Sequence, residues 1–466
     1  MKEKTLRMTQ GDPVRLLVAF AVPMLIGNIF QQVYNLVDSV IVGRFVGAGA
    51  LAAVGATNSV SFLFFSICNG IGSGGGIVTA QFFGAGDTDK IKRAMANSAY
   101  IMFGTALVMS VIAYLAAEAV LGFMNTPKDI MADAVVYMHM SCVGVPLIAV
   151  YNYVSSMLRA LGDSRTPLYF LIFSCFLNVG LDILCVYTLG LGVFGAALAT
   201  IIAQVAAGAG CLLYAVRTNS YFRLQKEHFK ADRNILWGAV RMGVPLALQY
   251  SMIAASSMAL QKVVNDFGMS AVAAFTATGR IEQLVHQPYG SLCMALSTYC
   301  GQNLGGGRLD RVKLGYRKGL VLVGVFSLVL LALMQLGGEG IVKIFVDDPE
   351  VIRLGARAIR ITSWFYFPLG MINVIRGMMN GVGDAMFAFV NGIVEVIGRI
   401  LIPRGLTRIP ALGVWGIWWS AGIVWLVSAF FCLLRYLSWK RKTGAGADGR
   451  TAAAVINGSN GSDTAQ

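Results

Sequence analysis

Charged residues are scarce in this sequence. Of its 466 residues, 13% are Asp, Glu, Lys or Arg, about half the ~25% that is typical of a soluble domain. Hydrophobic residues make up 56% of the chain. A chain with so little charge cannot cover a water-facing globule with polar side chains. The shortage therefore argues against a soluble protein and favours one whose solvent is lipid.

Residue patterns for enzymatic or metal chemistry are also missing. The three histidines, His139, His228 and His286, show neither metal-ligand spacing nor a nucleophile–base pattern. The eight cysteines form no C-x-x-C pair, which argues against a zinc site and a disulfide framework. The glycine run at 69–81 follows no strand and lacks the Lys-Ser/Thr of a phosphate-binding loop. Its small residues are expected to let helices approach closely. The sequence thus predicts no enzyme, no bound cofactor and no metal beyond a coupling ion.

Long apolar stretches dominate what is present. Twelve of them approach the ~20 residues that a helix needs to span a bilayer. The sequence therefore predicts an all-α membrane protein with twelve transmembrane helices. The polar N-terminus leads into a full-length span without a cleavage site, so we expect no removable signal peptide. The predicted spans cover about residues 14–40, 47–80, 94–118, 133–157, 166–188, 193–216, 238–265, 271–300, 316–338, 358–380, 386–403 and 414–437.

Basic residues are concentrated on one side of this predicted topology. If both termini are cytoplasmic, the basic clusters at 90–93, 217–241 and 308–318 all face the cytoplasm. This bias is the positive-inside signal of membrane proteins. The net charge of +14 is therefore expected to face anionic lipid, and nucleic acid is not an expected partner. A multi-pass protein of the plasma (inner) membrane with cytoplasmic termini is predicted.

The two halves of the sequence repeat each other. ALAAVGAT at 50–57 returns as AVAAFTAT at 271–278, and QFFGAG at 81–86 returns as QNLGGG at 302–307, both 221 residues later. Each half holds six predicted spans, and an even number returns the chain to its starting side. The halves are therefore expected to be parallel repeats, two six-helix lobes around a central cleft, as in transporters.

The domain boundaries follow from this repeat. We expect an N-terminal six-helix lobe at 1–216, a cytoplasmic linker at 217–237 and a C-terminal six-helix lobe at 238–440. The remaining residues, 441–466, are rich in Gly, Ala, Ser, Asn and Asp, and we expect a disordered tail there.

Polar side chains recur at helical spacing in three first-half segments. Two of them are aspartates, Asp38 and Asp182, and ionisable groups at membrane depth are by default ion or proton sites. Burial favours the protonated form of a carboxyl group, so such a group can carry a proton across. Its oxygens, together with Asn178, also suit Na⁺. For the uncharged residues, hydrogen bonds between packed helices are the stronger explanation. The polar positions are Gln31, Asn35 and Asp38, then Asn178 and Asp182, then Thr200 and Gln204.

This pattern resembles the multidrug and toxic compound extrusion (MATE) family of cation-coupled efflux transporters. The resemblance covers residues 10–440 and rests on Q-x-x-x-N-x-x-D ending at Asp38, on Asn178-x-x-x-Asp182, on Thr200 and on Pro23. As in the DinF-type branch, it implies a cation site of Asp38, Asn178, Asp182 and Thr200 in the N-terminal lobe. It also implies that Pro23 lets the first helix bend. The acids of the NorM-type branch in the seventh and tenth helices have no counterpart here, which favours the DinF-type branch.

The second half has its own charged residues within apolar segments. Arg280 and Glu282 are close neighbours in GRIEQL, and Glu395 and Arg399 stand at i and i+4 in NGIVEVIGRIL. We expect structural ion pairs, with a gate or a substrate contact as the alternative. Methionines of this half suit a soft lining for varied apolar ligands, and core packing explains them nearly as well.

The function predicted from these features is secondary active antiport. The protein is expected to export organic, cationic or amphipathic compounds in exchange for protons or sodium by alternating access. The alternative is a flippase for a lipid-linked saccharide of a related fold, which would need a strongly cationic cavity. The expected partners are small organic substrates and the lipid bilayer, and a monomer is expected. Candidates for lining the polar or substrate cavity are Gln31, Asn35, Gln204, Met252 and Met258.

Overall fold

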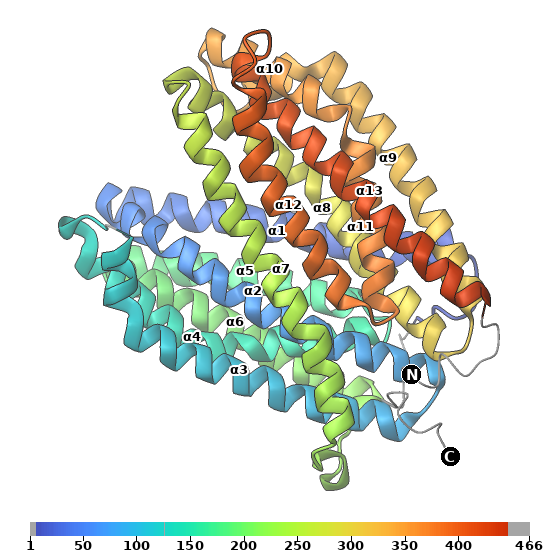
Figure 1. Cartoon of the computed structure of the whole chain (residues 1–466). Helices are drawn as coiled ribbons and strands as arrows, with labels where there is room; N and C mark the ends of the chain where they lie inside the picture. Colours follow the sequence, from blue (N-terminus) through green and yellow to red (C-terminus); the bar gives the residue numbers. More distant parts are fainter. Residues whose placement is uncertain (1–5, 125, 446–466) are drawn as a thin grey trace. The chain divides into compact units, whose positions relative to one another are not determined.

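The chain folds into α-helices joined by short connections. The computed structural model describes residues 6–124 and 126–445. It describes their side chains except those of 58–60, 63, 65, 250, 253–259, 444 and 445. No β-strand occurs among these residues. The α-helices (Figure 1) are α1 Pro13–Phe45, α2 Ala48–Ala85, α3 Thr88–Phe123, α4 Lys128–Ala160, α5 Arg165–Asp182, α6 Gly192–Thr218, α7 Arg233–Asn265, α8 Met269–Gly305, α9 Leu309–Lys343, α10 Pro349–Ser363, α11 Tyr366–Gly381, α12 Ala385–Leu406 and α13 Gly416–Ala445.

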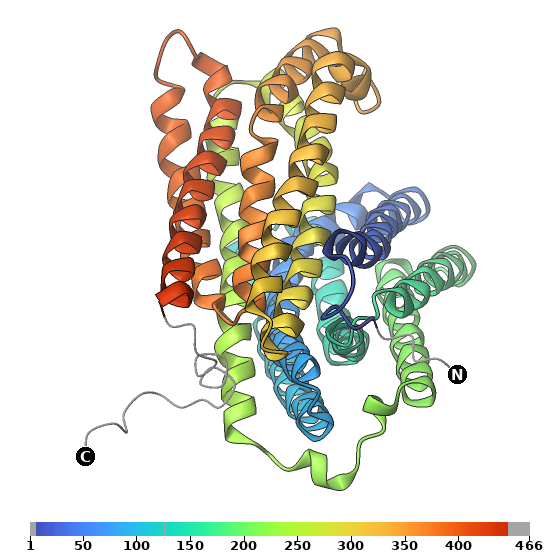
Figure 2. The same ribbon diagram turned by 90° about the vertical axis from the view of Figure 1, so that its right-hand side faces the viewer.

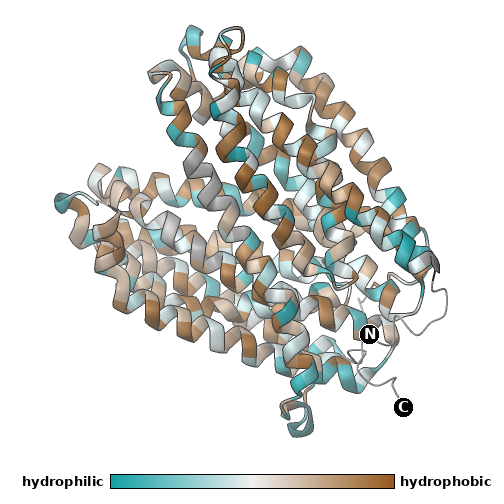
Figure 3. Ribbon diagram, in the orientation of Figure 1, coloured by the Kyte–Doolittle hydropathy of each residue, from teal (hydrophilic) through white to brown (hydrophobic). Residues whose placement is uncertain are grey.

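Each of the twelve predicted spans corresponds to one helix or to one helix pair. α5 continues into a π-helical turn, η1 (Ile183–Thr188), and α10 and α11 form a pair bent by 51°. Within the described residues, eight helices are long and apolar enough to cross a membrane, or nine spans if the bent pair counts as one. α8 is interrupted by charged side chains such as Arg280 and Glu282. Apolar residues run along most helices (Figure 3). The all-helical membrane fold is thus confirmed.

The helix ends follow from local sequence. Asp87 caps α3 by accepting the Lys90 N–H at 3.0 Å, and such a cap satisfies a backbone donor that the first turn leaves unpaired. Asp348 caps α10 in the same way, ahead of Pro349 at the first helical position. Gly86 ends α2 with φ +76°, a conformation that glycine adopts without strain. The connections can therefore be very short.

The chain forms two compact units. Unit 1 comprises Met1–Arg7 and Val22–Ala247, and unit 2 comprises Met8–Ala21 and Leu248–Gln466. In unit 1, α4 packs against α2, α3 and α6. In unit 2, α11 packs against α8, α9 and α13, and Trp418 is the largest fully buried side chain. The domain boundaries expected from the sequence stay a prediction. The tail expected at 441–466 is corrected at its start, because residues 441–445 are the last residues of α13. The rest of the expected tail, from 446 onward, lies outside the described residues.

The backbone repeats along with the sequence. Gly86 ends α2 with φ +76°, and Gly307, 221 residues later, lies just after the end of α8 with φ +70°. Four such glycine pairs occur at the same offset, each at corresponding helix junctions. The two parallel six-helix repeats are therefore confirmed at the level of the turns. The pairs are Gly47 and Gly268, Gly86 and Gly307, Gly162 and Gly383, and Gly192 and Gly413.

Candidate functional site

The end of α5 carries two buried polar side chains. Asn178 and Asp182 stand one helical turn apart and are 1% and 0% exposed. Asp182 is the last residue of α5, and the π-helical turn η1 begins directly after it. A π turn inside an α-helix is frequent at functional sites. The sequence thus places a carboxyl group in an apolar bundle where the backbone departs from regular helix.

Asp38 of α1 meets Asp182 within unit 1. The two carboxyl groups lie within hydrogen-bonding range of each other. The Oδ1 atom of Asp38 is buried and accepts no hydrogen bond from a described residue, and no described basic residue forms an ion pair with Asp38. Two neighbouring carboxyl groups repel each other when both are ionised, and a proton or a cation between them removes this repulsion. The pair therefore suits the binding of a proton or of a small cation.

Thr200 of α6 joins this cluster. Its Oγ1 lies 3.2 Å from the Tyr34 hydroxyl and accepts a hydrogen bond from Asn178 Nδ2 at 3.4 Å. The structure thus gathers Asp38, Asn178, Asp182 and Thr200, the four residues of the predicted cation site. Carboxylate, amide and hydroxyl oxygens are also the ligands that hard cations take. The role of these residues in cation coupling stays a prediction.

Two tyrosines belong to the same cluster, and the sequence analysis missed both. Tyr34 stands one turn before Asp38 on α1, and Tyr137 of α4 lies within electrostatic range of Asp38 and Asp182. The i−4 spacing of Tyr34 from Asp38 was a usable signal, since it places both on one helix face. Nothing in the sequence pointed to Tyr137, which tertiary packing brings to the site.

The predicted lining residues are more scattered. Asn35 is exposed, whereas Gln31, Gln204 and Met252 are half-buried. No contact among the described side chains places Gln31, Asn35 or Gln204 in the carboxyl cluster. The Met258 side chain lies outside the described residues. A substrate-lining role for these five residues stays a prediction.

Pro23 lies buried inside α1. Proline lacks the N–H that would bond one turn back, so it weakens the helix at that point. The residues of α1 up to Ala21 belong to unit 2 and those from Val22 to unit 1. Pro23 therefore stands close to the position where the helix passes from one unit into the other, as a hinge would require. The hinge itself stays a prediction.

In unit 2, Glu395 of α12 pairs with a partner other than the predicted one. Its Oε1 atom accepts a hydrogen bond from Arg376 of α11 at 2.7 Å, and also from Asn391 and Ser428 at 3.3 Å and 3.2 Å. The predicted pair with Arg399 is therefore corrected. Arg399 acts on Glu395 only electrostatically, because Arg376 of the neighbouring helix already occupies the carboxylate.

The second predicted ion pair, between Arg280 and Glu282, is also wrong. Arg280 is exposed and Glu282 is half-buried, and neither takes part in an ion pair within the described part of the chain. Residues two apart on a helix point to different faces, which explains the error. Glu282 instead lies within electrostatic range of Arg399. In unit 2, Glu282 and Glu395 therefore both lie close to arginines.

The family model MatE matches residues 23–184 and 245–402. The two matched segments begin at Pro23 and at Pro245, in line with the internal repeat.

Relatives along the whole chain agree with this match. The probable multidrug resistance protein YoeA of Bacillus subtilis is 29% identical over 91% of this chain and 93% of its own length. The multidrug export protein MepA of Staphylococcus aureus is 21% identical over 93% of this chain and 95% of its own length. A crystal structure of MATE in the bent conformation has a TM-score of 0.88 at 23% identity and covers 95% of this chain and 100% of the other. The chain therefore belongs to the MatE family, and it is a membrane transporter and not an enzyme.

Proposed function

We propose that the protein is a secondary antiporter that exports small organic compounds in exchange for protons or sodium. The observation that carries this proposal is the contact between Asp38 and Asp182, with Asp38 lacking a basic partner among the described residues. A carboxyl pair of this kind changes its interactions when it gains or loses one positive charge. Binding and release of the coupling ion at such a pair can therefore couple an ion gradient to transport.

The position of Asp38 on α1 links ion binding to movement. With a proton or Na⁺ between the carboxyl groups, α1 and α5 attract each other, and without it the two negative charges repel. Pro23 weakens α1 at a point N-terminal to Asp38 on the same helix. The change from attraction to repulsion between α1 and α5 can therefore bend α1 at Pro23. Binding of the ion on one side of the membrane then favours one conformation, and its release on the other side favours the second. This is how alternating access would be driven.

The exported compounds are expected to be organic, cationic or amphipathic molecules. Relatives with coverage over the whole chain are described as multidrug resistance or multidrug export proteins, and this supports the same activity here. The second half contains several methionines within its apolar segments, and the flexible side chain of methionine adapts to varied apolar ligands. We further assign the chain to the DinF-type branch and to the monomeric state.

Transport in proteoliposomes tests the proposal. Purified protein would be reconstituted with a fluorescent organic cation, and proton and sodium gradients would be imposed separately. We expect one of the gradients to drive accumulation, and the other to have no effect once the membrane potential is clamped. A compound that the protein transports by counterflow, yet that responds to neither gradient, would contradict antiport.

The orientation is proposed on the positive-inside bias of the basic residues. Both termini and the linker before α7 are expected in the cytoplasm of a cell whose plasma (inner) membrane holds the protein. A cysteine at Arg223, which is exposed, should react with a membrane-impermeant maleimide only after the cells are opened. Labelling in intact cells would reverse the assigned orientation. A background variant without the half-buried Cys175 and Cys293 serves as the control.

A further inference from the structure

The linker between α6 and α7 is bound along its length to unit 1. Residues 219–232 contain two short 3₁₀ turns, η2 (Ser220–Phe222) and η3 (Lys226–Phe229), and both contact α3. Figure 2 shows this segment in green between the two helices that it joins. Phe222 and His228 are 6% exposed. A loose tether would leave such side chains in solvent, so this linker is a docked part of the unit.

Asn97 of α3 is the centre of this docking. Its side chain is 0% exposed. Nδ2 donates to the carbonyl of Lys230 at 3.2 Å, and Oδ1 accepts the N–H of Asp232 at 2.9 Å. Nδ2 also donates to the carbonyl of Arg93 at 2.8 Å. One buried amide therefore fixes the backbone on both sides of residue 231, directly before α7 begins.

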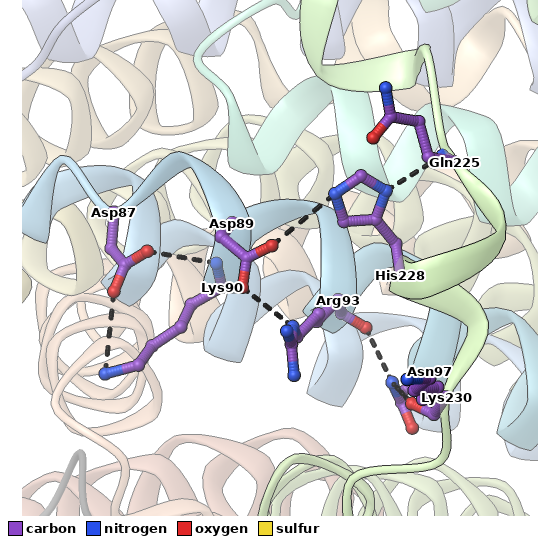
Figure 4. A network of polar contacts seen from close by, with 8 residues as sticks. All are labelled: Asp87, Asp89, Lys90, Arg93, Asn97, Gln225, His228 and Lys230. Carbon is purple, nitrogen blue, oxygen red and sulfur yellow. Dashed lines mark hydrogen bonds and ion pairs between the residues drawn. The ribbon is translucent and has the colours of Figure 1, made fainter.

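Neighbouring side chains extend the contact (Figure 4). The Tyr100 hydroxyl donates to the carbonyl of Phe229 at 2.9 Å. His228 accepts the N–H of Gln225 on Nδ1 at 2.8 Å, and its Nε2 lies 3.5 Å from Asp89. Asp89 is itself bound by Arg93 of the same helix at 2.7 Å. The amide of Asn97 is the only one of these groups that bonds to the linker with both its donor and its acceptor.

The first part of α7 is then held along its length by unit 1. Asp232 caps α7 by accepting the N–H groups of Asn234 and Ile235. Further along, a Cβ atom at Gly70 or Gly74 of α2 would overlap the backbone of Ala247 or Gly243. Backbones come this close only where small residues face each other. α7 leaves unit 1 after Ala247, two residues beyond Pro245.

The start of α1 is held in a corresponding way within unit 2. Asn303 of α8 is 0% exposed, and its Nδ2 donates to the carbonyl of Met8 at 3.1 Å. The Met8 N–H donates to Gln302 Oε1 at 2.9 Å, and Arg311 donates to the carbonyls of Met8 and Gly11. Nδ2 of Asn303 also donates to the carbonyl one turn back on its own helix, as Nδ2 of Asn97 does. Oδ1 of Asn303 accepts from Arg311 Nε at 3.0 Å, whereas Oδ1 of Asn97 accepts a backbone N–H. The two asparagines are not repeat-equivalent positions, and they share the bond from Nδ2 to a backbone carbonyl of the segment that they hold.

We propose that Asn97 and Asn303 are positioning residues for transport. Asn97 holds the segment before α7, the first helix of the second half, on α3 of the first half. Asn303 holds the segment before α1, the first helix of the first half, on α8 of the second half. The start of α7 consequently moves with unit 1 and the start of α1 with unit 2, and bending is confined to the regions of Pro245 and Pro23. This inference rests on the proposed antiport, because it assigns the moving parts of that cycle.

Hydrogen–deuterium exchange of the full-length protein in lipid nanodiscs tests the holding contact without any transport. In Asn97→Ala, we expect the amides of 229–232 to exchange about tenfold faster, as the loss of buried hydrogen bonds implies. Ser98→Ala is the matched control: Ser98 is buried on the same turn, and its hydroxyl has no partner among the described residues. Asn303→Ala should accelerate exchange at residues 8–12 and leave 229–232 unchanged. Unchanged exchange at 229–232 in Asn97→Ala would overturn the proposal.

Transport kinetics test the positioning role. We expect Asn97→Ala to lower the maximal rate about fivefold and to leave the half-saturating substrate concentration unchanged, because the change touches motion and not binding. Faster exchange with a normal maximal rate would overturn the positioning role. If Asn97→Ala does not fold, Tyr100→Phe removes only the bond to Phe229 and should give the same changes at about a third of the size. If the wild type transports nothing, the antiport proposal fails, and the exchange data still decide whether Asn97 holds the linker.

Discussion

The two halves of this protein share a backbone plan and differ in their buried charges. In the first half, Asp182 ends α5 close to Asp38, and Asn178 stands one turn before Asp182. The repeat-equivalent positions in the second half are Pro403 and Arg399. In the second half, Glu395 is bound by Arg376, and their first-half equivalents are Ser174 and Ser155. The duplicated fold therefore carries two unrelated polar sites.

The difference assigns the halves different tasks. A carboxylate held by an arginine and two further donors keeps its charge, so the Glu395 site is suited to joining helices and not to exchanging ions. Two carboxyl groups in contact bind one positive charge and can release it. Coupling is therefore expected in the first half alone.

Loss of the carboxyl pair should have the largest effect. We expect Asp38→Asn to reduce gradient-driven efflux to background, and the Asp38→Asn/Asp182→Asn double variant to be no worse, because the two residues act as one unit. The measurement is efflux of a fluorescent cation from proteoliposomes at equal protein content. The matched change in the other half, Glu395→Gln, should retain most of the efflux per folded molecule. An equal loss of gradient-driven efflux in Asp38→Asn and Glu395→Gln would contradict the conclusion that only the first half couples transport to an ion.

Disrupting the Arg376–Glu395 pair should affect stability instead. Glu395→Leu leaves a buried arginine without its partner and should cost about 3–5 kcal/mol of unfolding free energy. Replacing both residues, as Arg376→Met/Glu395→Leu, should recover most of this loss, since the desolvation of two charges is then removed. Denaturant unfolding in mixed micelles measures both. A double variant that is as unstable as the single one would show that Arg376 is needed beyond this pair.

The bend at Pro23 should have a moderate effect. Pro23→Ala restores a backbone hydrogen bond and should lower turnover about three- to tenfold while the protein still folds. Pro146→Ala is the control, because Pro146 lies inside α4, which belongs to one unit throughout. Turnover is measured by counterflow at saturating substrate. A Pro23→Ala protein with full turnover would make this proline purely structural.

Substitutions at the paired glycines of the two halves should have the smallest effects, and these effects on the free energy of unfolding should be nearly equal. Gly86→Ala and Gly307→Ala each force an alanine into a positive φ in open space, and each should cost about 1 kcal/mol of unfolding free energy. The two costs should agree within about 0.5 kcal/mol. Gly104→Ala, at an open helical position of α3, should instead be neutral or stabilising. Unequal costs at the paired glycines would mean that the halves differ in backbone as well as in charge.

The sequence predicted the helices better than it predicted the contacts between them. Apolar length located a helix or a helix pair for each of the twelve predicted stretches, because the bilayer fixes how long a spanning helix is. The carboxyl cluster was also predictable, since Asp38 and Asp182 are acids in apolar segments. Arg376 was overlooked because its partner Glu395 lies on another helix, and spacing rules describe only pairs within one helix. Tyr137 and the linker contacts of Asn97 depend on tertiary packing in the same way.

The most direct test of the central claim is a comparison of counterflow and gradient-driven transport in Asp182→Asn. This change keeps the size and hydrogen-bonding capacity of the side chain and removes its ability to bind and release a proton. Substrate counterflow without an ion gradient should persist, and transport driven by the gradient should be lost. Gradient-driven transport at the wild-type rate would show that Asp182 is a packing residue and that coupling occurs elsewhere.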